Sequence, residues 1–193
     1  MKIAISYPPL ESKKGVPLLS QNRQFQWFSD PTYIYPVVPA SAATLLSKNG
    51  YAVFWDDGIA EELSYEKWKD RIIKEQPDII AIETKTPVIK KHWKIIADLK
   101  NLSSSSSPYK GEDGLWNPKI VLMGDHVTAL SYESLNNCPV DYVLTGGDYD
   151  FALLNLANHI SKNESLMGGV WQRDKNNKII NSGPVDISQN NLE

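Results

Sequence analysis

The sequence has 193 residues and only one cysteine, Cys138. A single cysteine cannot form a disulfide within the chain, and it cannot supply a cysteine-only zinc or iron–sulfur site. We therefore expect a reducing, cytoplasmic setting for the protein. Cys138 precedes Pro139 and is predicted to be a small buried hydrophobic residue without a reactive role.

Positive charge is also scarce. The chain has 20 Lys and Arg residues against 23 Asp and Glu residues, for a net charge of -3. Without a cationic surplus, we expect no binding to nucleic acid or to an anionic membrane surface. No apolar run approaches the roughly 18 residues of a membrane span, and the segment 1–6 is too short for a signal peptide.

The motifs of several common α/β proteins are missing. The first expected strand is followed by Tyr7-Pro8-Pro9, whereas a dinucleotide-binding turn needs Gly-x-Gly at that place. A Walker A sequence is absent, and so are the acidic residues of a phospho-acceptor receiver domain. We find no histidine or cysteine pair at metal-ligand spacing and no nucleophile–base–acid set. The sequence thus argues against nucleotide binding and against catalysis by this chain alone.

Short, uninterrupted apolar segments alternate with helical patterns. Strands are predicted at 2–7, 51–55, 78–82, 119–123 and 141–144, and helices at 37–48, 64–76, 88–102, 131–136 and 150–160. Apolar strands separated by helices are typical of an α/β fold with a doubly wound parallel sheet. We expect five parallel strands in a flavodoxin-like order, forming a Rossmann-like domain over 1–164.

The remaining segments are expected to lie outside that sheet. A β-hairpin is predicted within 169–180, beyond the sheet, and 165–193 as a whole is assigned to this hairpin and a linker. The connection 10–36 is unusually long and suggests a lid or a docking surface. The five serines at 103–107 indicate a surface insertion. His92, within a lysine-rich helix, is expected at the surface, and His159 near a helix C-terminus is expected to be structural.

Ligands of such sheets bind at the carboxyl ends of the strands, which selects the loops starting at Tyr7 and Asp56 and the segments 83–86, 124–128 and 145–148. Gly124 would let a ligand approach the backbone, and His126 and Thr128 offer polar groups. The alternative is a helix cap at Asp125 or Thr128, with His126 facing solvent. The glycines at 146 and 147 can present N–H groups to an anion or amide, or they form a tight turn.

Taken in order, these segments resemble the cobalamin-binding domain at the N-terminus of many radical-SAM proteins. The segment 77–82 is similar to the family's Pro-Asp-Ile-Val-Gly-Ile strand, and 119–128 is similar to its Val-x-Gly-Gly-x-His-x-Thr strand and loop. The segment 141–148 is similar to its Asp-Tyr-Val-x-x-Gly-Glu-Gly-Glu. In this chain Asp125 replaces a glycine, and Gly147-Asp148 replaces Glu-Gly. The Asp-x-His-x-x-Gly motif that provides a histidine ligand to cobalt in methionine-synthase-like domains is absent.

The resemblance implies a cobalamin cofactor at the carboxyl ends of the strands, held without a histidine lower ligand. The binding residues that it implies are Tyr7, Pro8, Glu83, Thr84, Gly124, Asp125, His126, Thr128, Gly146, Gly147 and Asp148. S-adenosylmethionine and an iron–sulfur cluster would belong to a radical-SAM domain that follows this chain, in a methyltransferase-like enzyme. Two alternatives stay open: a degenerate, cofactor-free docking domain, and a small-molecule sensor or transferase half-domain with the same sheet.

Overall fold

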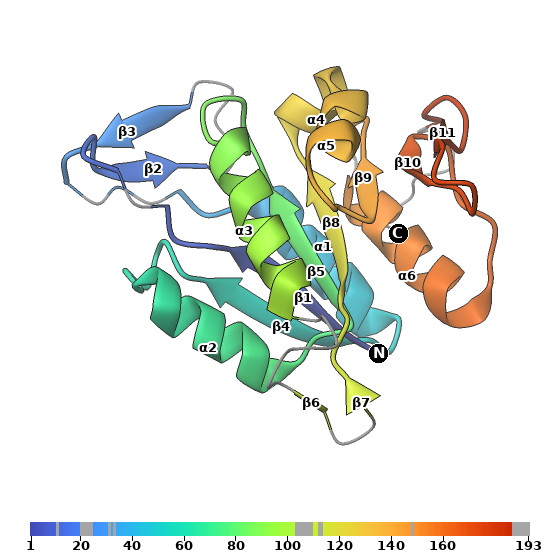
Figure 1. The fold of residues 1–193 in the computed structure, drawn as a ribbon, viewed down its shortest axis with the longest axis horizontal. Coiled ribbons are helices and arrows are strands. Elements are labelled where there is room, and N and C mark those ends of the chain that lie inside the picture. Colours follow the sequence, from blue (N-terminus) through green and yellow to red (C-terminus); the bar gives the residue numbers. More distant parts are fainter. Residues whose placement is uncertain are drawn as a thin grey trace.

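The structure, a computed structural model, describes residues 1–10, 12–19, 25–30, 32, 34–102, 110–111, 114–147 and 149–186. Within this part of the chain the main sheet has seven strands in the order β11-β10-β9-β8-β5-β1-β4 (Figure 1). The parallel strands are β1 (Lys2–Tyr7), β4 (Ala52–Asp57), β5 (Ile79–Glu83), β8 (Lys119–Met123) and β9 (Tyr142–Leu144). Their order confirms the predicted flavodoxin-like arrangement.

Helices cover both faces of the sheet. The pair α1 (Val37–Lys48) and α6 (Tyr149–Lys162) packs together behind the sheet in the view of Figure 1. The helices α2 (Tyr65–Glu75), α3 (Ile89–Leu102), α4 (Asp125–Ala129) and α5 (Ser131–Asn137) lie in front. Because both faces are covered, the central strands are apolar without alternation, and β5 is buried along its whole length.

Local signals explain where the helices begin and end. The hydroxyl of Ser64 accepts a hydrogen bond from the backbone N–H of Lys67 at 3.4 Å, which caps the start of α2. Trp68, Ile72 and Ile73 lie on one face of α2 and are buried. The strand predictions are accurate to within a few residues, but the short helix α4 falls where the sequence indicated only a loop.

The C-terminal hairpin is present, but its predicted position beyond the sheet is wrong. The strand β10 (Val170–Arg173) pairs antiparallel with β9, and β11 (Ile179–Asn181) pairs antiparallel with β10. Val170 is fully buried by this pairing. The hairpin joins the sheet because β9 would otherwise present an unpaired backbone edge.

Two long connections have structure of their own. Between β1 and α1, the strands β2 (Val16–Leu18) and β3 (Gln26–Phe28) form a small antiparallel hairpin that the sequence did not predict. The polar stretch after α3 contains β6 (Lys110–Gly111) and β7 (Gly114–Leu115), while the serines 103–107 lie outside the described residues. This stretch ends in the buried Trp116, whose indole N–H donates to the Pro77 carbonyl at 2.9 Å.

Candidate functional site

The carboxyl ends of the parallel strands carry a connected set of polar side chains. The strand β1 lies between β4 on one side and β5 on the other, so the direction of the strand order reverses beside β1. Ligands of open α/β sheets bind outside the strand ends at such a switch point. Here the hydroxyl of Tyr7, at the end of β1, donates to Oε2 of Glu83, at the end of β5, at 2.6 Å.

Glu83 is the buried centre of this set. Only 2% of the residue is exposed, and Oε1 accepts a second, longer hydrogen bond of 3.5 Å from the hydroxyl of Tyr149. Burial raises the pKa of Glu83, while the hydrogen bond from Tyr7 and the charge of Lys85 act in the opposite direction. Burial and the neighbouring carboxyl group raise the pKa of Tyr7, so the phenol keeps the proton that it donates.

Lys85 connects the loop after β5 with the loop after β8. Its ammonium Nζ lies 2.5 Å from Oδ2 of Asp125 and 4.0 Å from Oε1 of Glu83. The Lys85 side chain is 8% exposed, whereas that of Asp125 is 65% exposed. Lys85 was not among the predicted binding residues. The sequence signal that could have found it is its place within Glu83-Thr84-Lys85-Thr86, directly after a buried strand at the switch point.

His92 holds the same loop from the side of α3. Its Nδ1 lies 2.7 Å from the hydroxyl oxygen of Thr84. The prediction that His92 is at the surface is wrong, because the residue is fully buried. The ring lies on the helix face that Ile89 and Ile96 also turn toward the sheet. Burial lowers the pKa of His92 to about 3, so the imidazole is neutral at pH 7.

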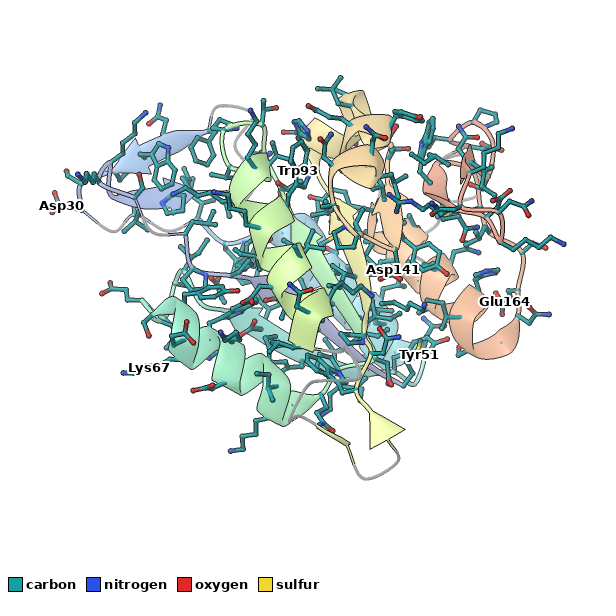
Figure 2. The ribbon with its side chains drawn as sticks, in the orientation of Figure 1. Asp30, Tyr51, Lys67, Trp93, Asp141 and Glu164 are labelled. Carbon is teal, nitrogen blue, oxygen red and sulfur yellow. The ribbon has the colours of Figure 1, made fainter. Side chains whose placement is uncertain are left out.

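His126 forms a second contact with this loop. It is 3% exposed, on α4, with Nδ1 3.1 Å from the hydroxyl oxygen of Thr86 and Nε2 3.2 Å from Oε2 of Glu133. Trp93 meets the His126 ring edge-on from α3, beside α4 and α5 (Figure 2). Burial lowers the pKa of His126, and Glu133 opposes the shift. The solvent-facing alternative for His126 is therefore wrong.

The three glycines of the predicted site have different surroundings. Gly124 has a φ of 113°, and a Cβ there would lie 2.5 Å from the backbone oxygen of Thr84. Gly124 thus permits two loops to approach each other, which differs from the predicted approach of a ligand. A Cβ at Gly146 would meet Val185 at 2.7 Å, but one at Gly147 would meet nothing within 4 Å. Of these three glycines, Gly147 alone faces open space.

Exposure divides the predicted residues into two groups. The buried residues lie beneath the surface at the carboxyl ends of the strands and form the floor of the candidate site: Tyr7, Pro8, Glu83, Thr84, Gly124 and His126. The exposed ones can touch a ligand: Asp125, Thr128, Gly146 and Gly147. The Thr128 hydroxyl donates to the Gly124 carbonyl, four residues earlier, at 3.0 Å, so it does not cap the start of α4. Asp148 lies outside the described residues.

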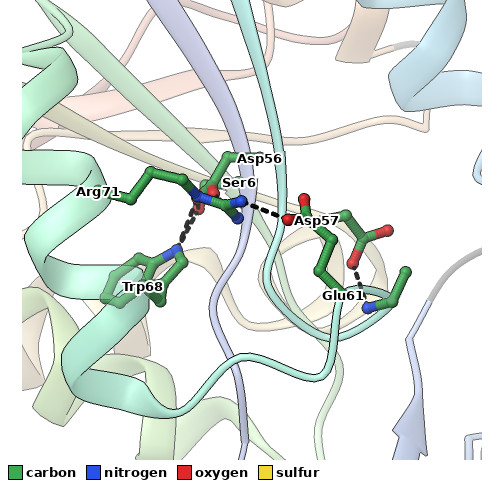
Figure 3. A network of polar contacts seen from close by, with 7 residues as sticks. Ser6, Asp56, Asp57, Glu61, Trp68 and Arg71 are labelled. Carbon is green, nitrogen blue, oxygen red and sulfur yellow. Dashed lines mark hydrogen bonds and ion pairs between the residues drawn. The ribbon is translucent and has the colours of Figure 1, made fainter.

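A second polar network fixes the ends of β1 and β4 to α2 (Figure 3). Asp56 is fully buried, accepts hydrogen bonds from Ser6 and from the indole N–H of Trp68, and pairs with Arg71. Arg71 also pairs with Glu61 at 2.6 Å. Burial raises the pKa of Asp56, and these partners oppose the shift. Asp56 and Arg71 are engaged with each other and with neighbouring side chains of the protein, so we assign this network a structural role.

One pocket lies away from the switch point. This pocket, of 630 Å³, lies at the opposite edge of the sheet, where β8 and β9 begin, between α5 and the hairpin. Its charged residues are engaged within the protein: Lys119 with Asp141 at 3.5 Å, and Arg173 with backbone carbonyls of Leu135 and Val140. Cys138 also lines it, and burial raises the pKa of this thiol to about 11, as expected for an inert cysteine.

Within the described residues, no group of three or more His, Cys, Asp or Glu side chains is arranged to hold a metal ion. Among the same residues, no helix combines the length and the apolar character that crossing a bilayer requires.

Comparisons with known proteins show what the fold resembles. No family model matches the sequence. A curated relative, an uncharacterized methyltransferase of Pyrococcus horikoshii, is 26% identical over 135 residues, which cover 69% of this chain and 27% of the relative.

Solved structures share the fold over 96% of this chain. The radical S-adenosylmethionine methyltransferase TsrM from Kitasatospora setae, with cobalamin and a [4Fe-4S] cluster bound, matches with a TM-score of 0.65 and 13% identity. The cobalamin-dependent S-adenosylmethionine radical enzyme OxsB, with aqua-cobalamin bound, matches with a TM-score of 0.69 and 12% identity. This chain spans 29% of the TsrM chain and 22% of the OxsB chain.

Proposed function

We propose that this chain is a cobalamin-binding module and that the corrin lies over the carboxyl edge of the sheet. One observation carries the proposal: the fixed polar set of Tyr7, Glu83, Lys85 and Asp125 lies at the switch point of a fold shared with two enzymes whose structures contain cobalamin. A polar set at the strand ends, held in place before any ligand arrives, is typical of a binding site in this class of sheet.

The residues present fit a corrin, which has broad apolar faces and a rim of amides. Gly147 leaves open space beside its backbone. Leu130 and Tyr132 follow β8 and are half-exposed or more, as are Tyr35 and Val37 at the start of α1, so apolar surface adjoins the polar set. Both ring nitrogens of His126 face groups of the protein, Thr86 and Glu133, which suits a cofactor held without this imidazole on cobalt.

Cobalamin supplies group-transfer or radical chemistry that side chains alone cannot provide. The protein's own part is to bind and orient it. The buried Tyr7–Glu83 pair gives a floor that does not rearrange, and the contacts of Thr84 with His92 and of Thr86 with His126 fix the adjoining loop. A site fixed before binding loses little conformational entropy when the ligand arrives.

The whole protein is proposed to continue into a radical-SAM domain that holds S-adenosylmethionine and the iron–sulfur cluster. The support is that the solved relatives TsrM and OxsB are radical S-adenosylmethionine enzymes, of which this chain spans less than a third. A methyltransferase activity is proposed for that larger protein, in keeping with TsrM and with the relative from Pyrococcus horikoshii. The division into 1–164 and 165–193 and the cytoplasmic setting remain part of this proposal.

The test is retention of a corrin by the purified 193-residue chain. Hydroxocobalamin is titrated into the protein, the mixture is desalted, and the corrin absorbance that stays with the protein is measured. Gly147→Asn places a side chain in the open space at the site, and we expect weaker retention. Asparagine is used because it tolerates the left-handed backbone that Gly147 adopts.

Gly50→Asn is the matched control. Gly50 has a φ of 85°, close to the 90° of Gly147, and a Cβ there also meets nothing within 4 Å, but Gly50 lies at the opposite edge of the sheet. Its corrin retention should equal that of the wild type. If the folded wild-type chain keeps no corrin, the proposed function is wrong and a cofactor-free docking role takes its place.

A further inference from the structure

The two partners of the ion pair between Lys85 and Asp125 differ greatly in their exposure to solvent. Lysine is almost never buried unless it is paired. Here the Lys85 side chain is only 8% exposed, whereas the side chain of its partner Asp125 is 65% exposed. The Asp125 carboxylate itself is well solvated when it turns into water, because it is already largely exposed. The Lys85 ammonium is held at the sheet edge, so the structure places a fixed cation beneath a displaceable anion.

The surroundings of Lys85 keep that cation in position. Glu83 lies 4.0 Å from Nζ and is itself held by the hydroxyl of Tyr7. The residues on either side, Thr84 and Thr86, are held by His92 and His126. The loop therefore cannot carry Lys85 away when Asp125 leaves. A lone buried ammonium is unfavourable, so a departing Asp125 must be replaced by another anion.

We propose that Lys85 binds the phosphodiester of the nucleotide tail of cobalamin, which takes the place of the Asp125 carboxylate. This inference rests on the proposed function. The phosphodiester carries one negative charge, so the exchange keeps the charge around Lys85 constant. It also replaces one charge-assisted hydrogen bond by another of the same kind. Asp125 then serves as an internal counterion that occupies Lys85 until the cofactor arrives.

Cobinamide provides the decisive comparison, because it has the corrin ring but lacks the phosphodiester and the nucleotide. Affinities of the wild-type chain for aquacobalamin and for diaquacobinamide are measured by absorbance titration. In Lys85→Gln we expect the affinity for aquacobalamin to fall about tenfold, the usual order for loss of a hydrogen bond to a charged group. The affinity for diaquacobinamide should change less than about twofold, since that ligand has no group for Lys85.

Asp125→Asn tests the exchange from the other side. Without the Asp125 carboxylate only the more distant Glu83 remains beside Lys85, and we expect the affinity for aquacobalamin to rise by about two- to fivefold, the range for an exposed ion pair. Lys119→Gln is the matched control, because it removes another Lys–Asp pair, with Asp141, at the opposite edge of the sheet. That variant should bind both corrins as the wild type does.

Each outcome decides the inference. Equal losses for the two corrins in Lys85→Gln, or no loss for either, would overturn the phosphodiester assignment while leaving the cobalamin module intact. A folded wild-type chain that binds neither corrin would overturn the proposed function and the inference with it. If circular dichroism shows that Lys85→Gln does not fold, Asp125→Asn decides alone, and an unchanged affinity for aquacobalamin overturns the proposal.

Discussion

The buried ring of His92 makes the stability of the protein sensitive to acid. Its pKa is lowered to about 3, from 6.5 in the unfolded chain, because burial disfavours the charged ring. Nε2 has no hydrogen-bond partner in the part of the chain that the structure describes, so a second N–H would be buried without an acceptor. As the pH falls below about 6.5, the unfolded chain takes up this proton and the folded chain does not. Stability is lost as the pH falls toward 3.

This behaviour predicts a difference between the wild type and His92→Leu. The contribution of His92 to the free energy of unfolding should shrink by about 2 kcal/mol between pH 7 and pH 5, since each pH unit is worth about 1.4 kcal/mol. In His92→Leu this part of the decrease in unfolding free energy between pH 7 and pH 5 should disappear. The measurement is urea unfolding at both pH values.

His159→Gln is the control variant, because His159 lies near the end of α6, is only partly buried and does not contact the loop that His92 holds. It should lose as much stability at low pH as the wild type does. If the wild type and His92→Leu lose the same unfolding free energy between pH 7 and pH 5, the loss comes from other titrating groups and not from His92.

His92 also shows why the burial of a single residue is hard to predict from one sequence. Its neighbours Lys90, Lys91 and Lys94 indicate a solvated helix face, and that impression led to the wrong prediction. The helical spacing of Ile89, His92 and Ile96 was the better signal, because it places all three on the buried stripe. Lys85 escaped prediction for another reason: its partner Asp125 is 40 residues away, and one sequence does not show that pairing.

At the scale of elements, Gly124 joins the loops after β5 and β8 by allowing their backbones to touch. In Gly124→Ala we expect a loss of unfolding free energy of about 2 to 4 kcal/mol. This loss combines the strain of a positive φ with a contact of 2.5 Å to the Thr84 carbonyl. Gly147→Ala carries the strain without the contact and should lose only about 1 to 2 kcal/mol. Chemical denaturation of both variants measures the difference.

Equal losses in the two variants would show that the loop after β5 moves aside. Binding tests at Gly124 are uninformative for the same reason, since a substitution there disturbs the site before any ligand is present. At Gly147 a side chain meets no other group of the protein, so an effect on ligand binding can be told apart from an effect on the packing of the loops.

The strands and helices themselves were largely predictable. Continuous apolar segments such as 79–82, alternating with helical patterns, are typical of strands between two helical layers, and right-handed crossovers then restrict the order of the strands. The β2–β3 hairpin and the docking of β10 were not predictable, because each depends on a long-range partner. The strand β10 pairs with the edge of β9, and the local sequence of 170–173 gives no indication of that pairing.

At the scale of the whole molecule, the C-terminal hairpin belongs to the sheet that carries the site. We therefore predict that a chain ending at residue 164 is less stable than the full chain. The loss of buried Val170 alone costs about 2 kcal/mol. Removal of Arg173 also leaves the Leu135 and Val140 carbonyls without their donor. Thermal unfolding followed by circular dichroism measures the loss.

A chain ending at residue 186 is the matched control, because it keeps the hairpin and removes only residues outside the described part. It should unfold as the full chain does. If the chain 1–164 unfolds at the temperature of the full chain, the boundary at 164 marks an independent domain, and the hairpin contributes nothing to the sheet that holds the site.

The place of β1 in the sheet also bears on how the protein is made. The strand β1 precedes the other strands of the sheet in the chain, yet it lies in the interior, between β4 and β5. After β4 has paired on one side, every later strand of the sheet adds in turn to the other side: β5, β8, β9, β10 and β11. Nascent chains emerge at about 5–20 residues per second, so each strand meets an edge completed a few seconds earlier. The strand order therefore allows the sheet to grow in the order of translation, and the proposed cofactor floor between β1 and β5 can form before β8 is made.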